Sequence, residues 1–375
     1  KMKKIMSIFG TRPEAIKMAP LVKKLNEDPQ IRSVLCVTAQ HREMLDQVLD
    51  LFGLTPDYDL NIMKPNQTLS MITANVLTGL DPILEKEKPD IVLVHGDTST
   101  TFSAALAAFY HRIPVGHVEA GLRTYDMYSP FPEEVNRVLT GHLTSVHFAP
   151  TQRNADNLIR EGIDPEKIII TGNTVIDALL EVADRPYEFE DETLKHIDFE
   201  NKRVIAVTCH RRENLGEYMH NIFEAIREIA EDFEDVEVVY PVHMNPKVRA
   251  AASEVFGGCA NIHLIEPLSY QPFVNLMAKS YFIITDSGGM QEEAPSLGKP
   301  VLVVRKETER PEAVSAGTVK LAGVRRETIA ALARELLTDR KAYDAMSKAS
   351  NPYGDGTACD KILEALKWQN TQIGK

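Results

Sequence analysis

The chain has 375 residues, and 42 lysines and arginines against 54 aspartates and glutamates give it a formal net charge of −12. This length allows two or three domains with sizeable cores. The acidic balance excludes the cationic surface that non-specific nucleic-acid binding or docking on anionic lipid requires. No apolar stretch approaches the ~18 residues of a membrane-spanning helix, so we expect neither nucleic acid nor membrane as a partner.

The four cysteines, Cys36, Cys209, Cys259 and Cys359, are far apart and form no CxxC pair. This pattern argues against a disulfide framework and a structural zinc site, and it favours a reducing compartment. The start of the sequence leads directly into an apolar run without a signal-peptide cleavage site. We therefore expect a cytoplasmic protein without a bound metal.

Short apolar runs, each followed by a helical stretch, recur along the chain. They are continuous rather than alternating, which is typical of strands covered on both faces, and their alternation with helices predicts parallel α/β sheets. Twelve strands fit two Rossmann-like domains better than the eight strands of a single TIM barrel. The first half contains the runs 5–9, 34–39, 91–95, 115–118, 146–149 and 168–171, and the second half contains 204–208, 236–242, 262–265, 282–285, 301–304 and 318–321.

We place the domain boundary after Asn173, ahead of a polar, acidic segment at 184–201 that leads into the next strand. This predicts an N-terminal Rossmann-like domain of residues 1–173 and a C-terminal one of residues 174–375. A final helix is expected at about 358–368, and packing of this helix back on the N-terminal domain is an open alternative.

Doubly wound sheets bind ligands beyond the carboxyl ends of their strands, so the residues that follow each strand are the most informative. Gly10-Thr11-Arg12-Pro13-Glu14 follows the first strand and opens a helix that contains Lys17. Arg12 would stand beside a helix N-terminus, a place that favours anions. A plain turn with a surface arginine explains the same residues. The GxGxxG dinucleotide fingerprint is absent here.

Acidic residues follow the next strands of the first half. Asp97 lies in His95-Gly96-Asp97-Thr98, Glu119 follows the strand at 115–118, and Glu133 lies in a loop that begins at Pro130. Each alone is more often a helix cap or a solvated charge. Together they predict a cluster in which neighbouring carboxylates push their pKa values apart, so that one acts as acid and another as base.

The second half places His210 at the end of the strand 204–208, beside two arginines. A histidine there suits acid–base work or a phosphate contact, although a hydrogen-bonded structural histidine is an equal alternative. His243, after the strand 236–242, is a second candidate of the same kind. Neither histidine shows the spacing of metal ligands.

The strongest local signal is the segment 286–294, DSGGMQEEA, directly after the strand 282–285. A glycine-rich turn that opens a helix presents backbone N–H groups to a phosphate. Glu292 and Glu293 could accept hydrogen bonds from ribose hydroxyls, and Arg310 could supply a cation for a pyrophosphate. A purely structural turn is the alternative.

Taken together, these segments resemble the non-hydrolysing UDP-N-acetylglucosamine 2-epimerases over nearly the whole chain. The resemblance implies an α/β GT-B fold, with two Rossmann-like domains and an active site in the cleft between them. It also implies a cytoplasmic homodimer that needs no cofactor and that interconverts UDP-N-acetylglucosamine and UDP-N-acetylmannosamine for cell-surface polysaccharides. The motifs are GTRPE at 10–14, HGDT at 95–98, VEAGLR at 118–123, PEEVNR at 132–137, HRREN at 210–214, SGGMQEE at 287–293 and NPYGDG at 351–356.

The resemblance also assigns residues to roles. It implies a catalytic set of Asp97, Glu119, Glu133 and His210, with the division into base and acid left open. An allosteric site for a second UDP-N-acetylglucosamine would include Gln40, Glu43, Arg211 and His243, although Glu43 and Asn66 stand where a glutamine and an arginine are expected. The implied substrate-binding residues are Arg12, Lys17, Phe273, Ser287, Gly288, Gly289, Glu293 and Arg310.

The implied reaction eliminates UDP to give 2-acetamidoglucal and then adds UDP back after a proton has returned to the opposite face of C2. Three other functions fit parts of the sequence: a hydrolysing epimerase that releases free N-acetylmannosamine and UDP, a GT-B glycosyltransferase, and a nucleotide-sugar sensor without catalysis. A nicotinamide oxidoreductase is disfavoured because the GxGxxG fingerprint is missing.

Overall fold

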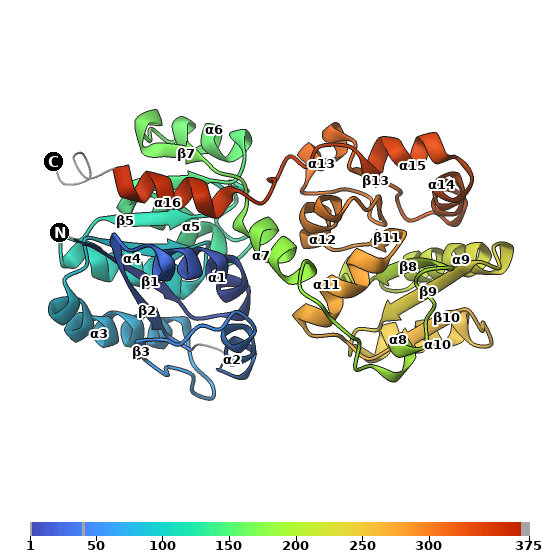
Figure 1. Cartoon of the computed structure of the whole chain (residues 1–375), viewed down its shortest axis with the longest axis horizontal. Helices are drawn as coiled ribbons and strands as arrows, with labels where there is room; N and C mark the ends of the chain where they lie inside the picture. The colour runs from blue at the N-terminus through green and yellow to red at the C-terminus, as the bar shows by residue number, and fades with distance from the viewer. Residues whose placement is uncertain (1, 40–41, 369–375) are drawn as a thin grey trace. The chain divides into compact units, whose positions relative to one another are not determined.

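The computed structural model describes residues 2–39 and 42–368, which form two compact units (Figure 1). Unit 1 comprises Lys1–Ala178 together with Tyr353–Lys375, and unit 2 comprises Leu179–Pro352. The chain thus passes into unit 2 within helix α7 (Thr174–Ala183), after Ala178, whereas the sequence prediction places the boundary after Asn173. The last described segment, residues 353–368, belongs to unit 1.

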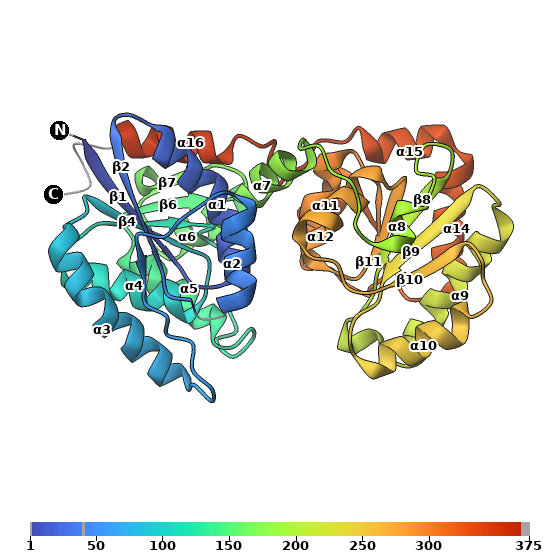
Figure 2. The same cartoon turned by 60° about the horizontal axis from the view of Figure 1, so that its bottom comes forward.

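Unit 1 is built on one parallel sheet with the strand order β3-β2-β1-β4-β5-β6-β7. The order runs outward in both directions from β1 and β4, which defines a doubly wound sheet, and Figure 2 shows its twist. The six strands predicted in this half are confirmed, while the two-residue strand β3 was not anticipated. The strands are β1 (Lys3–Phe9), β2 (Ile31–Val37), β3 (Tyr58–Asp59), β4 (Ile91–His95), β5 (Val115–Val118), β6 (Val146–Ala149) and β7 (Ile168–Ile170).

Helices cover both faces of this sheet, which explains why its strands are apolar throughout. Met6 and Ile8 of β1 pack into a core with α3 and α4. Ile5 and Phe9 of the same strand are also fully buried, as expected for a strand covered on both faces. The helices of unit 1 are α1 (Arg12–Glu27), α2 (Arg42–Leu51), α3 (Leu69–Glu87), α4 (Ser99–Tyr110), α5 (Glu133–Leu143), α6 (Gln152–Arg160), the first half of α7, and α16 (Ala358–Trp368), with a short 3₁₀ turn, η1, at Pro165–Lys167.

Unit 2 repeats this architecture with six parallel strands in the order β10-β9-β8-β11-β12-β13. All six strands predicted in this half are confirmed, and two open sheets exclude the TIM barrel. The order reverses between β8 and β11, which is the point where sheets of this kind bind ligands. The strands are β8 (Arg203–Thr208), β9 (Val236–Pro241), β10 (Ile262–Ile265), β11 (Phe282–Thr285), β12 (Val301–Val303) and β13 (Val319–Leu321).

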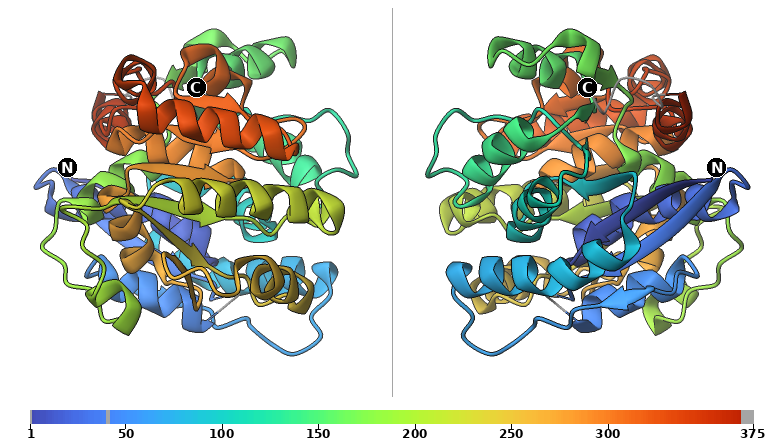
Figure 3. Two further views of the ribbon diagram at one scale, coloured as in Figure 1. Left: turned by 90° about the vertical axis from the view of Figure 1, so that its right-hand side faces the viewer. Right: turned by 90° about the vertical axis from the view of Figure 1, so that its left-hand side faces the viewer.

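The core of unit 2 joins its sheet to α9, α10, α14 and α15 on one side, and Figure 3 shows helices on both faces of each sheet. Its largest buried side chains include Phe223, Tyr240 and Phe282. The helices are α8 (Glu192–Lys195), α9 (Glu217–Asp232), α10 (Pro246–Phe256), α11 (Tyr270–Lys279), α12 (Gly288–Glu293), α13 (Pro311–Ala316), α14 (Arg326–Thr338) and α15 (Arg340–Ser347), with 3₁₀ turns η2 (Arg212–Asn214) and η3 (Ala294–Leu297).

Helix α16 completes unit 1, where it lies against α1 (Figures 1 and 2). Ile362 and Leu366 are fully buried on its inner face. The Asp177 carboxylate accepts hydrogen bonds from the Ala358 and Cys359 backbone N–H groups at 3.3 and 2.8 Å, and therefore caps the start of this helix. Along the described chain, no helix combines the length and apolarity needed to cross a membrane.

Candidate active site

The turn after β1 is fixed to the turn after β4 by one buried carboxylate, that of Glu14. Its Oε2 accepts from the Gly10 and Thr11 backbone N–H groups at 3.1 and 2.8 Å, and Thr11 is the N-cap of α1. Its Oε1 accepts from Thr98 Oγ1 at 2.8 Å. Arg12, half-buried, is therefore held at the first position of α1, where backbone N–H groups favour an anion.

Glu119 follows β5 directly and carries the central carboxylate of unit 1. Its Oε2 accepts from Lys17 Nζ at 2.6 Å and from Asn173 Nδ2 at 3.2 Å, and it lies 3.6 Å from His95 Nε2. The backbone of Glu119 has φ = 63°, in the left-handed region that residues other than glycine rarely adopt. Strain of this kind is held by surrounding contacts and is concentrated at functional sites.

The Glu119 carboxylate is ionised in spite of its burial. Burial raises its pKa, but the Lys17 ammonium and the nearby His95 ring together hold the pKa well below its usual value. A largely buried anion beside a partly buried lysine thus lies at the end of β5.

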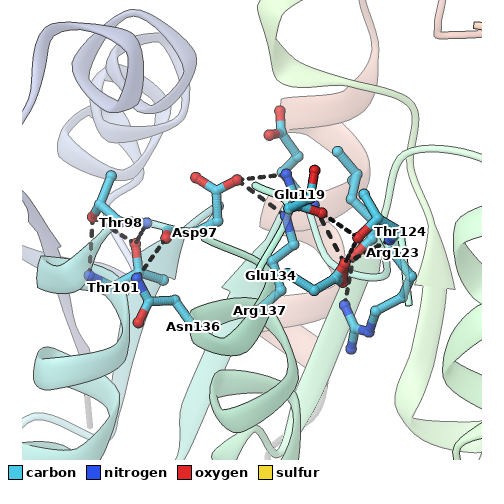
Figure 4. A network of polar contacts seen from close by, with 12 residues as sticks. Asp97, Thr98, Thr101, Glu119, Arg123, Thr124, Glu134, Asn136 and Arg137 are labelled. Atoms are coloured by element: carbon cyan, nitrogen blue, oxygen red, sulfur yellow. Dashed lines mark hydrogen bonds and ion pairs between the residues drawn. The ribbon is translucent and has the colours of Figure 1, made fainter. Parts of the chain in front are cut away.

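Asp97, after the neighbouring strand β4, is clamped by an arginine (Figure 4). Arg137 of α5 donates through Nε and Nη2 to Asp97 Oδ2 at 3.0 and 2.8 Å, and Asn136 Nδ2 donates to the Asp97 carbonyl oxygen at 3.0 Å. The other side of the Arg137 guanidinium lies 4.0 Å from the buried Glu134 carboxylate, which accepts from the Thr124 backbone N–H at 2.6 Å. The cation therefore fixes Asp97 to α5.

Glu133 is the first residue of α5 and is half-buried. Its carboxylate makes no hydrogen bond or ion pair within residues 2–39 and 42–368. The structure thus brings Asp97 and Glu119 to the ends of adjacent strands and places Glu133 on the helix that carries Arg137.

In unit 2, His210 lies in the loop after β8, where its backbone is fixed by Asp286. The His210 and Arg211 N–H groups donate to Asp286 Oδ2 at 2.9 and 2.8 Å. The His210 ring stacks on that of His243, with 5.0 Å between ring centroids. Partial desolvation by the loops around it lowers the pKa of His210, although its surface is exposed.

The glycine-rich turn after β11 is lined by two guanidinium groups. Ser287 is the N-cap of α12, and a Cβ added to Gly288 would lie 3.6 Å from Arg310 Nη2 and 3.8 Å from Arg211 Nη2. A Cβ added to the exposed Gly289 would lie 3.4 Å from Glu293 Oε2. Two cations beside a helix start can bind a diphosphate.

Glu292, which the sequence suggested for ribose hydroxyls, is buried and accepts from Arg310 Nε at 2.6 Å. This ion pair orients the arginine toward the turn. Phe273 is half-buried on α11, the helix that precedes β11 and its glycine-rich turn.

The residues suggested for an allosteric site are found in both units. Glu43 is exposed in the first turn of α2 in unit 1, and Arg211 and His243 follow strands β8 and β9 in unit 2. Gln40 lies outside the described residues.

Three residues that organise these sites were missed by reasoning from the sequence. Arg137 lies in the quoted segment 132–137, four residues after Glu133 and therefore on the same helix face. Glu14 stands three residues after Thr11, which is the spacing of a capping box. Asp286 follows β11 directly, but nothing in the sequence indicates that its carboxylate reaches the loop after β8.

No group of three histidine, cysteine, aspartate or glutamate side chains in the described parts of the chain is arranged to hold a metal ion.

Two buried histidines lie side by side in the sheet of unit 1. His117 of β5 pairs in register with His147 of β6. Burial lowers the pKa of His117 to about 3 and that of His147 to about 4, and both are therefore neutral in the folded protein near pH 7. Unfolding exposes them to water, where a histidine has a pKa of about 6.5.

This burial predicts a loss of stability as pH falls from about 6.5 to 5. In that window the excess of protons bound by the unfolded chain at these histidines rises from about one to about two, so the free energy of unfolding should fall by about 3 kcal/mol. Urea denaturation at several pH values measures this change. We expect His147→Leu to remove about half of the dependence, and His196→Gln, at an exposed position in unit 2, to leave it unchanged. An equal pH dependence in His147→Leu would contradict the assignment.

Comparison with known proteins identifies relatives over almost the whole chain. The family model described as UDP-N-acetylglucosamine 2-epimerase matches residues 23–367. The UDP-N-acetylglucosamine 2-epimerase of Bacillus subtilis is 60% identical over 363 residues, which cover 97% of this chain and 94% of the relative.

Solved structures agree with this relationship. A crystal structure of a UDP-N-acetylglucosamine 2-epimerase has a TM-score of 0.92 and 56% identity, and the match covers 99% of this chain and 98% of that one. The enzyme from Neisseria meningitidis, solved with UDP-GlcNAc bound, has a TM-score of 0.82 and 53% identity, with 97% and 99% covered. The two doubly wound sheets are thus those of a GT-B fold.

Proposed function

The chain belongs to the UDP-N-acetylglucosamine 2-epimerase family, and from this premise we propose that it inverts C2 of UDP-N-acetylglucosamine by elimination and re-addition of UDP. The product of inversion at C2 is UDP-N-acetylmannosamine. The observation that carries the proposal is the largely buried, ionised Glu119 beside Lys17, at the end of the strand next to the one that presents Asp97. Two carboxylates held in different surroundings suit proton transfer in two directions.

Elimination solves a chemical difficulty of this substrate. The C2 hydrogen is not adjacent to a carbonyl group, so its direct removal is very unfavourable. In the proposed first step a base takes the C2 proton while the C1–O bond breaks, and the bonding electrons leave with UDP. The C2–H electrons form the C1=C2 double bond of 2-acetamidoglucal. In the second step a proton adds to the opposite face of C2, and a UDP oxygen forms the new bond to C1.

We assign proton removal and return to Asp97, Glu119, Glu133 and His210 as a set. Positive charge develops on the sugar ring as the C1–O bond breaks, and carboxylates stabilise such a ring in glycosidases. Arg137 keeps Asp97 oriented through two hydrogen bonds, and Lys17 keeps Glu119 ionised. Inversion needs proton donors and acceptors for both faces of C2, which one fixed group does not supply.

We assign the nucleotide to unit 2. Negative charge develops on the departing diphosphate, and arginines placed in advance stabilise it. Arg310 beside Gly288, together with Ser287 and Gly289 of the same turn, supports this assignment. Glu293 would accept from the ribose and Phe273 would pack near the uracil, while Arg12 would contact the substrate from the start of α1. Binding of UDP-GlcNAc by the Neisseria relative supports the same ligand here.

A nuclear magnetic resonance time course of UDP-N-acetylglucosamine in deuterated water tests the reaction. We expect UDP-N-acetylmannosamine to form without an added cofactor, with deuterium at C2 in both the product and the recovered substrate. Turnover without deuterium at C2 would exclude the elimination route. Steady accumulation of free UDP and N-acetylmannosamine would instead identify a hydrolysing epimerase.

The resemblance also implies that the product supplies cell-surface polysaccharides and that the protein is a cytoplasmic homodimer. These assignments, and activation by a second UDP-N-acetylglucosamine molecule, stay predictions.

A further inference from the structure

The carboxylate of Asp286 lies at the point of unit 2 where the strand order reverses. Strands β8 and β11 are neighbours there, and sheets of this kind bind ligands beyond the carboxyl ends of such a pair. The loop with His210 and Arg211 follows β8, and the glycine-rich turn with Gly288 follows β11. Asp286 stands between the two segments and is fully buried.

One oxygen of this carboxylate organises the loop after β8. Asp286 Oδ2 accepts from the His210 and Arg211 N–H groups at 2.9 and 2.8 Å and from Asn214 Nδ2 at 3.1 Å. Asn214 Nδ2 also donates to the Val304 carbonyl oxygen at 3.1 Å, which ties the loop to the end of β12. The backbone of a proposed proton-transfer residue and of an arginine beside the glycine-rich turn is therefore fixed by a single anion.

The other oxygen, Oδ1, is buried and accepts no hydrogen bond from an N–H or O–H group in the described part of the chain. The Cys209 thiol, directly after β8, lies beside this carboxylate, and burial together with this negative charge raises the pKa of the thiol. A carboxylate whose only role is to join two loops would stabilise the fold most if both of its oxygens accepted hydrogen bonds. An unpaired buried acceptor instead carries a desolvation penalty. The hydrogen bonds that hold the loop thus account for only one of the two carboxylate oxygens.

The negative charge of Asp286 acts on His210. Three charged or titratable groups act electrostatically on His210: Asp286 from the end of β11, His243 from the segment after β9, and Arg211 from its own loop. Of these, His243 stacks on the His210 ring, and Asp286 accepts from the His210 backbone N–H. Desolvation lowers the pKa of His210, and His243 and Arg211 lower it further, whereas Asp286 raises it. Asp286 is thus the negative charge that opposes two cationic or titratable neighbours.

We propose that Asp286 is a positioning residue for the epimerase reaction: its carboxylate fixes the backbone of His210 and Arg211 and supplies the negative charge that keeps His210 competent for proton transfer. This inference rests on the proposed function, in which His210 belongs to the proton-transfer set. Asp286 acts through His210 and has no contact with the substrate in this role.

Asp286→Asn in the full chain separates the charge from the hydrogen bonds, because the amide oxygen can replace Oδ2. We expect kcat to fall about tenfold or more, with the Kd for UDP, measured by calorimetry, changed less than about threefold. The limb of the kcat–pH profile that disappears in His210→Asn should move to lower pH by about half a unit or more. In the His210→Asn background, Asp286→Asn should cause no further loss of kcat.

The matched control is Asp235→Asn, which removes the same charge from a carboxylate paired with Arg203 at the opposite end of β8. It should leave kcat and the pH profile unchanged. Two results would show a merely structural role and overturn the inference. One is that Asp286→Asn leaves this limb of the kcat–pH profile at its wild-type pH. The other is that Asp286→Asn lowers kcat by the same factor in the wild-type and the His210→Asn backgrounds.

A second variant covers the case in which Asp286→Asn does not fold. Asn214→Ala keeps the carboxylate but removes one of its three donors, so kcat should fall while the pH limb stays in place. Wild-type kcat in this variant would overturn the positioning role. Absence of turnover in the unaltered protein, or full activity of His210→Asn, would instead count against the proposed function.

Discussion

Replacing Asp97 by asparagine should lower kcat by about a hundredfold to ten-thousandfold, which is the contribution that positioned acids and bases usually make. The substitution keeps the volume of the side chain but removes the charge that Arg137 holds at 2.8 and 3.0 Å. The affinity for UDP should change little, since we assign the nucleotide to unit 2. Initial rates of UDP-N-acetylmannosamine formation and calorimetric titration with UDP measure the two quantities separately.

A matched control for this change is Asp156→Asn on α6. Asp156 is exposed and accepts from Gln152 Nε2 at 2.8 Å, so its substitution removes the same charge from unit 1 without touching the strand ends. We expect this control to retain full activity. Full activity in Asp97→Asn as well would remove Asp97 from the proton-transfer set.

Glu119→Gln should lower kcat by about a thousandfold and should also reduce the free energy of unfolding at pH 7. The glutamine keeps the size of the side chain, but it removes the negative charge that lies 2.6 Å from the partly buried Lys17 ammonium. Removal of one partner of a fully buried pair costs about 3–5 kcal/mol, and the partial exposure of Lys17 reduces this to about 2 kcal/mol.

The sign of the pH dependence makes this second effect specific. Because the folded pKa of Glu119 lies below its unfolded value of about 4.3, the carboxylate stabilises the fold above that pH and loses its effect as pH falls toward the folded pKa. The difference in urea stability between Glu119→Gln and the unaltered protein should therefore be largest at pH 7 and shrink below pH 4. Glu166→Gln, at an exposed position in η1, is the control. A difference that stays constant with pH would show that Glu119 is not the titrating group.

The sequence predicted the parts of the fold that repeat a strong pattern. Buried parallel strands are continuous apolar runs, so twelve of the strands were found with ends close to those observed. Strand β3 was missed because Tyr58–Asp59 is too short to show any period. The site residues were found where they follow strands directly, since the ends of parallel strands meet at one edge of a sheet.

Contacts between distant segments could not be predicted in the same way. Glu14 bonds to Thr98, and Asp286 bonds to the backbone of His210 and Arg211, across separations that depend on the order of the strands. The sequence predicts where strands lie along the chain. The order of the strands in the sheet depends on how helices pack against both faces of that sheet. The left-handed backbone of Glu119 is likewise imposed by its surroundings, because glutamate has no local preference for it.

The return of α16 to unit 1 has a consequence for the way the protein is made. Unit 2 is one uninterrupted segment inserted between the two parts of unit 1, so its whole chain leaves the ribosome before α16 does. Until α16 has been synthesised, the Asp177 carboxylate cannot accept its hydrogen bond from the start of that helix, and the face of α1 that α16 covers is exposed. The unit that is begun first is therefore completed last, and the face of α1 that α16 covers stays uncovered until the end of synthesis.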